Sequence, residues 1–77
     1  MNNTRRMAIM KIAERLEELK TDFELLRDEE QEAFDNMPES IQESERGEHV
    51  ENIIYNMDEV LENLESAFDT INALEDD

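Results

Sequence analysis

The chain has 77 residues and no cysteine, so we expect one small domain without disulfides or thiolate metal sites. A formal charge of −16 excludes direct nucleic-acid binding, because phosphate contacts need clustered Lys and Arg. One Gly, one Pro and 39% charged residues are typical of an almost entirely helical protein. No apolar run approaches the roughly 18 residues of a membrane span, and charged residues interrupt the N-terminal apolar stretch, so no transmembrane helix, membrane contact or signal peptide is expected.

The first helix is expected over residues 4–36, with Thr4 as its N-cap. Its apolar residues repeat at steps of three and four, which is the a/d pattern of a coiled-coil heptad. They are Ile9, Ile12, Leu16, Leu19, Phe23, Leu26, Ala33 and Met37. Glu30 interrupts this seam, and it either stays hydrated or accepts a hydrogen bond from Arg46 or His49 across the hairpin. The pattern predicts one narrow apolar stripe on this helix.

The connection between the helices is expected over residues 37–43, because Pro38 cannot continue a helix and disfavours helical backbone in the residue before it. Proline also suits the first position of a short helical turn. Two N-caps compete for the helix that follows. Ser40 forms a capping box with Glu43, and Ser44 is the alternative.

The second helix, expected over residues 44–75, carries the stronger heptad pattern. Its a/d seam consists of Val50, Ile54, Met57, Leu61, Leu64, Phe68 and Ile71. Beside it a further apolar series repeats every seven residues: Ile53, Val60, Ala67 and Leu74. This apolar face is wider than one partner helix covers, so we assign these four residues to an oligomer interface. Tyr55 lies off the seam, where it is either exposed or part of the same interface.

Two long helices with a short connection predict an all-α antiparallel helical hairpin spanning residues 1–77. Two helices alone cannot cover the surplus apolar series. We therefore expect a homodimer or higher homo-oligomer, assembled as a four-helix bundle or coiled coil with the second helix at its centre. The end charges favour the antiparallel pairing, since Arg5 and Arg6 would lie beside the acidic residues 75–77.

Charge is divided unequally along the chain. Residues 1–27 carry a net charge of +1, and residues 28–77 carry −17. A solvated acidic surface is the usual meaning of such a run, and a docking surface for a basic partner is the less common one.

The residue content does not predict an enzyme. There is one His and no Cys, and no nucleophile, base and orienting group are arranged as a hydrolytic triad requires. The segment around Glu45 and His49 partly matches the Glu-x-x-His pattern of di-iron bundles, but the second pair that such a site needs is missing. No metal and no cofactor are therefore expected.

One polar cluster at the hairpin end is a predicted ligand site. Ser44, Arg46 and His49 lie near the start of the second helix, whose amides also favour anions. If two hairpins pack head to tail, Arg5 and Arg6 of one copy approach Arg46 of the other and complete an anion pocket. The alternative is a capped loop in which Arg46 pairs with Glu43 or Glu39.

The segment EEQEAFDNMPESIQESERGE and the heptads ENIIYNMDEVLENLESAFDTI that follow it resemble a family of short acidic helical proteins encoded by bacteriophages and prophages. The resemblance covers most of the chain and is sharpest in DNMPESIQESERGE, residues 35–48. It implies a small phage accessory protein of the host bacterial cytoplasm, acting by binding as a counter-defence factor. It carries over no catalytic residue, and it suggests that the loop has a specific role.

These observations lead to three functional hypotheses. The first is a non-enzymatic protein that sequesters a host defence protein or an anionic signal molecule, such as a nucleotide, through Ser44 and Arg46. The second is an acidic nucleic-acid mimic that inhibits a basic DNA-binding host protein. The third is a structural protein that only self-assembles.

Overall fold

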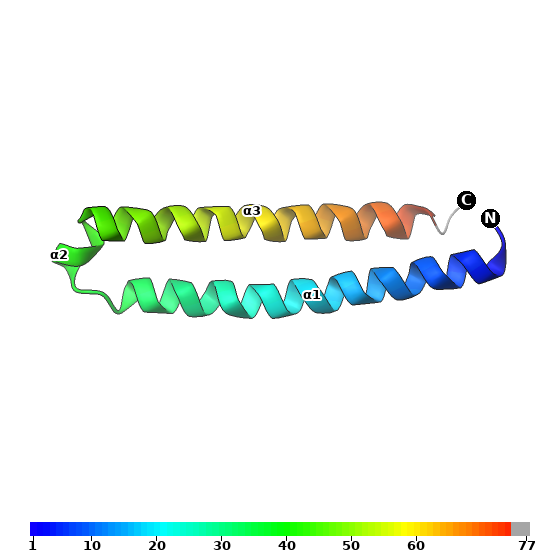
Figure 1. Cartoon of the computed structure of the whole chain (residues 1–77), viewed down its shortest axis with the longest axis horizontal. Coiled ribbons are helices and arrows are strands. Elements are labelled where there is room, and N and C mark those ends of the chain that lie inside the picture. The colour runs from blue at the N-terminus through cyan, green and yellow to red at the C-terminus, as the bar shows by residue number, and fades with distance from the viewer. Residues whose placement is uncertain (75–77) are drawn as a thin grey trace.

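In the computed structural model, which describes residues 1–74, the chain forms an extended helical hairpin (Figure 1). Helix α1 (Asn3–Asp35) and helix α3 (Glu45–Ala73) run antiparallel, and the short helix α2 (Glu39–Gln42) joins them. The molecule measures 59 × 15 × 13 Å, so it is a rod only two helices wide. The predicted all-α antiparallel hairpin is confirmed.

The start of α1 and the end of α3 lie at one end of the rod, and α2 lies at the other (Figure 1). At this end of the rod, the first turns of α1 extend beyond the last turn of α3 (Figure 1). The predicted attraction between Arg5, Arg6 and the acidic residues 75–77 lies outside the described residues.

The helices begin at side-chain caps. Asn2 is the N-cap of α1, because its Oδ1 accepts a hydrogen bond from the backbone N–H of Arg5 at 2.8 Å. The prediction of Thr4 as N-cap is therefore wrong, since asparagine caps at least as well as threonine and extends the helix toward the N-terminus. Of the two alternatives at the other long helix, Ser44 is the N-cap of α3, and Ser40 lies inside α2.

Helix α3 packs on α1 through the seam predicted from its heptads. Val50 and Ile54 are buried, with exposed fractions of 9% and 6%. The remaining members of the seam are half-buried: Met57, Leu61, Leu64, Phe68 and Ile71. This is the depth of burial that a rod of two helices can reach, because each seam residue has a neighbouring helix on one side only.

Helix α1 meets α3 with a stripe that is rotated relative to the predicted one. The buried and half-buried residues of this stripe, running into the loop, are Arg6, Ile9, Ala13, Leu16, Lys20, Phe23, Arg27, Glu30, Phe34 and Met37. Ile12, Leu19 and Leu26 were expected in the seam, but they are 48%, 57% and 53% exposed.

Two features favour this rotation. It brings Lys20 and Arg27 within reach of acidic residues on α3. It also places Ala13, which is 4% exposed, between the helices, where a small side chain allows a close approach. As a consequence α1 also has a surplus apolar series, and the prediction of one narrow stripe on this helix is wrong.

Candidate functional site

The two surplus apolar series lie on the same long side of the hairpin. In each helix the exposed series stands three residues after one set of seam residues, such as Leu16 in α1 and Met57 in α3. Viewed from one end of the hairpin, successive residues of the two antiparallel helices rotate in opposite directions. Residues at equivalent heptad positions therefore lie on the same side of the helix pair. Both series therefore face one direction and form a continuous surface.

We call this surface the apolar face. It consists of Ile12, Leu19, Leu26 and Ala33 from α1 and of Ile53, Val60, Ala67 and Leu74 from α3. Ile53, Val60 and Leu74 are 36–40% exposed, and the large α1 residues are more exposed still. Contiguous apolar patches above a few hundred Å² are uncommon on monomeric proteins. The seven-residue repeat in the sequence predicted the α3 half of this face, whereas the α1 residues were expected in the seam between the helices.

Other exposed apolar residues do not belong to the apolar face. Tyr55 is 66% exposed, but it stands two residues after Ile53, which is about 200° around the helix. It therefore lies on another side of α3. Met7, Met10 and Leu25 are also exposed, without the seven-residue repeat, and single exposed apolar residues are ordinary.

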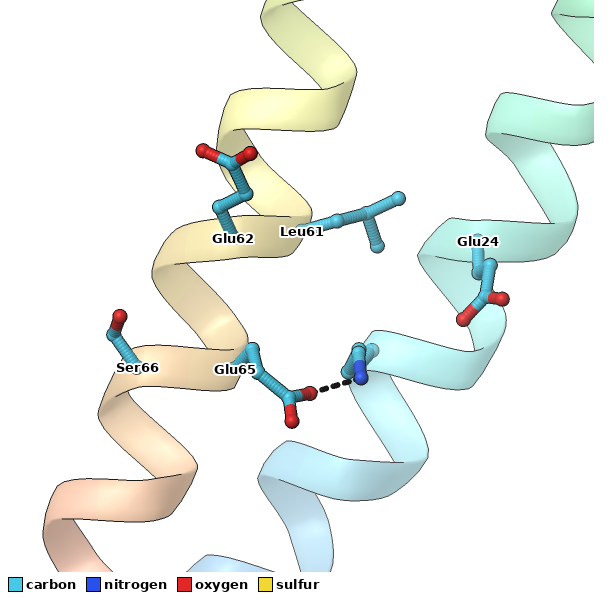
Figure 2. A pocket seen from close by; sticks show the side chains of 6 residues that line it. Glu24, Leu61, Glu62, Glu65 and Ser66 are labelled. Atoms are coloured by element: carbon cyan, nitrogen blue, oxygen red, sulfur yellow. Dashed lines mark hydrogen bonds and ion pairs between the residues drawn. The ribbon is translucent and has the colours of Figure 1, made fainter.

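The opposite long side of the hairpin is closed by ion pairs between the helices. Arg27 Nε donates to Asp58 Oδ1 at 2.8 Å, and its Nη2 donates to Asp58 Oδ2 at 3.3 Å. Lys20 Nζ pairs with Glu65 (Figure 2). The hydrogen bonds to these carboxylates raise the pKa of Arg27 and of Lys20 above their ordinary values. The hairpin thus has one charged side and one apolar side.

A shallow open groove lies beside the Lys20–Glu65 pair (Figure 2). Leu61 points across it toward α1, whereas Glu62 and Ser66 point away from α1. The one cation that lines it is already paired with a carboxylate, and its other charged residues are glutamates. This groove therefore offers little to an anionic ligand.

The loop that joins the helices is held by a side-chain amide. Gln42 Nε2 donates to the carbonyl of Phe34 at 3.0 Å and to that of Met37 at 3.1 Å. It also approaches the carbonyl of Asp35 at 3.5 Å. The last carbonyls of a helix have no partner within the helix, so this glutamine caps the C-terminal end of α1 from the far side of the loop.

Ser44 and Gly47 fix the start of α3 against α2. Ser44 Oγ donates to the carbonyl of Ile41 at 2.5 Å and accepts from the N–H of Gly47 at 3.5 Å. Gly47 is buried, and a Cβ at this position would lie 2.0 Å from the carbonyl oxygen of Gln42. Only glycine fits there without moving the backbone. Much of the unusual loop sequence therefore has a structural role, which the sequence analysis did not assign to Gly47 or Gln42.

The predicted anion-site residues are divided between the two ends of the rod. Ser44, Arg46 and His49 lie at the α2 end, and Arg5 and Arg6 lie at the other end (Figure 1). One chain does not bring the two groups together, so a shared pocket requires a second copy, as the sequence analysis assumed.

Arg46 is exposed, and within residues 1–74 it forms no ion pair with Glu39, Glu43 or any other acid. Glu30 is half-buried and forms no hydrogen bond or ion pair with Arg46 or His49 over the same residues, in keeping with a hydrated side chain. Arg46 also stands seven residues before Ile53, and Arg5 seven before Ile12. Each apolar series is therefore preceded by an arginine.

In the part of the chain that the structure describes, no group of His and acidic side chains is arranged to hold a metal ion. None of the helices there is long and apolar enough to cross a membrane. Comparisons of this chain with protein-family models, with curated proteins and with solved structures gave no match.

Proposed function

We propose that this protein is a non-enzymatic binding protein that works as a homo-oligomeric helical bundle, with the apolar face as its self-association surface. The observation that supports this most directly is the placement of two heptad-spaced apolar series on one side of the rod. Chemistry in enzymes usually requires an enclosed site that excludes water, whereas a long apolar strip beside charged surface is typical of a helix-packing interface.

The free energy available from this face is of the size that association requires. Complete burial of a Val, Leu or Ile side chain contributes about 1.5–3 kcal/mol, so a side chain that is already half-buried contributes about 1 kcal/mol. The large residues Ile12, Leu19, Leu26, Ile53, Val60 and Leu74 then contribute roughly 12 kcal/mol for two copies. Loss of translational and rotational freedom costs about 4–15 kcal/mol. We therefore expect an equilibrium that depends on concentration.

Single substitutions on and off the apolar face test this assignment. Val60→Asn places an amide in the middle of the face and should shift the protein toward monomer. Tyr55→Asn removes an even more exposed apolar side chain from another side of α3, so it is the matched control and should leave self-association unchanged. Sedimentation equilibrium over a range of concentrations measures both. A wild-type chain that remains monomeric at high micromolar concentration would overturn the proposal.

A second proposal is that the assembled protein captures an anionic ligand, such as a nucleotide, or a host defence protein through Arg46. Among the residues that follow the loop, Arg46 is exposed and lacks an ion pair with any described acid, while Ser44 and Gly47 serve the fold. A counter-defence role, which the resemblance to phage proteins implies, belongs to this proposal.

Arg46→Ala tests ligand capture directly. Lys11→Ala is the control, because Lys11 is an exposed cation at a distant position of α1. Calorimetric titration with a panel of nucleotides, and native mass spectrometry of protein from infected-cell lysate, give the readout. We expect Arg46→Ala to keep its helicity and oligomer size and to lose the ligand, whereas Lys11→Ala should retain it. Equal affinity in both variants would refute a role for Arg46.

The acidic surface supports a third proposal, mimicry of nucleic acid toward a basic protein. Residues 28–77 carry a net charge of −17, and Glu51, Glu59, Glu62 and Asp69 are exposed along α3. Affinity for a basic DNA-binding protein should then fall steeply as salt rises, because salt screens attraction between exposed charges. An affinity that does not change with salt would contradict this mechanism.

A further inference from the structure

We infer that the occupant of the apolar face is a second copy of the chain turned end for end, so that α1 packs on the partner's α1 and α3 on the partner's α3. This inference rests on the self-association proposed above and adds the orientation of the copies. It follows from the charges along the rims of the apolar face and from the register of the two helices.

Two twofold arrangements can bring one apolar face against another. If the axis runs along the rods, both loops lie at the same end and each α1 covers the partner's α3. If the axis crosses the rods, the loops lie at opposite ends and each helix covers its own equivalent. Both are closed, self-complementary interfaces, so symmetry alone does not choose between them. Polar and charged residues beside the apolar positions set the orientation of helical bundles.

The rim of α3 beside the apolar face is uncharged. Its residues repeat every seven positions and are His49, Asn56, Asn63 and Thr70. This is unusual in a half of the chain with a net charge of −17, where other exposed positions of α3 are mostly acidic. When a helix packs on its own copy, the same rim meets itself wherever the two copies overlap, which here includes Asn63 and Thr70. An acidic rim would then repel itself, whereas amide and hydroxyl groups can hydrogen bond to one another.

The rim of α1 at the equivalent positions consists of Ala8, Arg15, Asp22 and Glu29. Two of these residues, Arg15 and Asp22, have opposite charges and stand seven positions apart. Both residues are exposed, and neither forms an ion pair with any residue in the range 1–74. An antiparallel pairing of α1 with itself, centred between residues 18 and 19, places Arg15 beside the partner's Asp22 and repeats the pair across the axis. In the alternative arrangement these charges face the uncharged rim of α3 and remain without a partner.

The register of the hairpin agrees with this centre. The ion pairs Lys20–Glu65 and Arg27–Asp58 set residues 20 and 27 level with residues 65 and 58. An axis between residues 18 and 19 of α1 therefore crosses α3 near Ala67, the smallest residue of its apolar series. Alanine is well suited to the point at which two copies of α3 approach each other. Because α1 runs from Asn3 to Asp35, an axis near its middle lets the two copies of α1 overlap along nearly their whole length. The two copies of α3 overlap from about residue 60 to their C-terminal ends, where Asn63 lies level with the partner's Thr70.

Cysteine cross-linking tests the orientation, because the chain has no native cysteine. Ala67→Cys should form a disulfide-linked dimer under mild oxidation, since the axis brings this position next to its own copy. Ser66→Cys is the control, because this neighbouring exposed residue lies on the outer side of α3 and should stay unlinked. With both loops at one end, the two copies of α3 lie diagonally across the bundle and Ala67→Cys would not cross-link.

Charge exchange gives a second readout that does not depend on oxidation. Arg15→Asp and Asp22→Arg should each weaken the dimer by about three- to tenfold, and the double variant should recover the wild-type dissociation constant. Failure of the double variant to recover, or a dimeric wild type whose Ala67→Cys variant stays unlinked, would overturn the orientation alone. A wild type that is monomeric at every concentration would overturn the proposed self-association as well.

Discussion

Gly47→Ala should destabilise this protein, although the same substitution in most helices stabilises. Replacing a helical glycine by alanine usually raises the free energy of unfolding by about 0.5–1 kcal/mol, because glycine loses more conformational freedom on folding. Here the added Cβ would lie 2.0 Å from the oxygen of Gln42, 2.4 Å from its carbonyl carbon and 2.6 Å from the oxygen of Ile41. All three atoms are backbone, so no side-chain rotation relieves the clash.

The magnitude follows from what must move. To reach a normal contact, α2 has to shift by about 1 Å or more away from the first turn of α3. Overpacking of this kind costs about 1–3 kcal/mol. The shift also disturbs the Ser44 cap, and loss of an N-cap costs about 1 kcal/mol. After allowing for the helix propensity of alanine, we expect a net loss of about 2 kcal/mol, which lowers Tm by roughly 8–16 °C in a domain of this size.

Thermal unfolding followed by circular dichroism at equal protein concentrations measures this effect. Asn52→Ala is a suitable control, because this exposed residue lies within α3 and alanine should raise stability there by a few tenths of a kcal/mol, about 0.3–0.6. If Gly47→Ala is as stable as the wild type or more stable, then α2 does not pack on α3 as closely as described. The loop sequence would then need an explanation other than packing.

Three further predictions follow from the same structure. Ser44→Ala removes the cap of α3 and should lower the free energy of unfolding by about 0.5–2 kcal/mol in urea titrations, whereas Ser40→Ala, inside α2, should cost less. The Lys20–Glu65 pair raises the pKa of Lys20 in the folded protein. The contribution of this pair to the free energy of unfolding is therefore fully present below the unfolded pKa of 10.5 and is lost as pH rises through the higher folded pKa. In unfolding measured against pH, Lys20→Met should match the stability of the wild type only above pH 10.5. Raising the salt concentration from about 0.01 M to about 1 M shortens the electrostatic screening length from about 30 Å to about 3 Å. Self-association should then tighten, because two copies of charge −16 repel each other less. Sedimentation that shows dissociation at high salt would contradict this prediction.

The sequence predicted the hairpin and the packing of α3 because each depends on a regular pattern. Pro38 ends one helix, and the heptads of α3 place Val50 and Ile54 on its inner side. The packing of α1 could not be read in the same way. Its apolar residues form two adjacent stripes, and periodicity does not say which stripe meets its own chain. The choice depends on tertiary contacts, such as those of Arg27 with Asp58.

The loop shows the same limit. Asparagine, serine and proline signals located its turns, but the need for glycine at position 47 arises from the close approach of Gln42. The chain has only one glycine, and its position inside a helix was the signal that could have indicated such a contact. The role of the Gln42 amide depends on the path of the loop, which no local rule predicts.

The burial pattern also determines how the rod opens. Gly47, Val50 and Ile54 are buried close to the loop, whereas Ala13 is the one buried residue toward the chain ends within residues 1–74. Amide protons near the loop should therefore exchange with solvent most slowly, and exchange should quicken toward the two termini. The two helices should therefore separate more readily at the end far from the loop than near the loop. Such a local opening leaves the buried residues near the loop in contact.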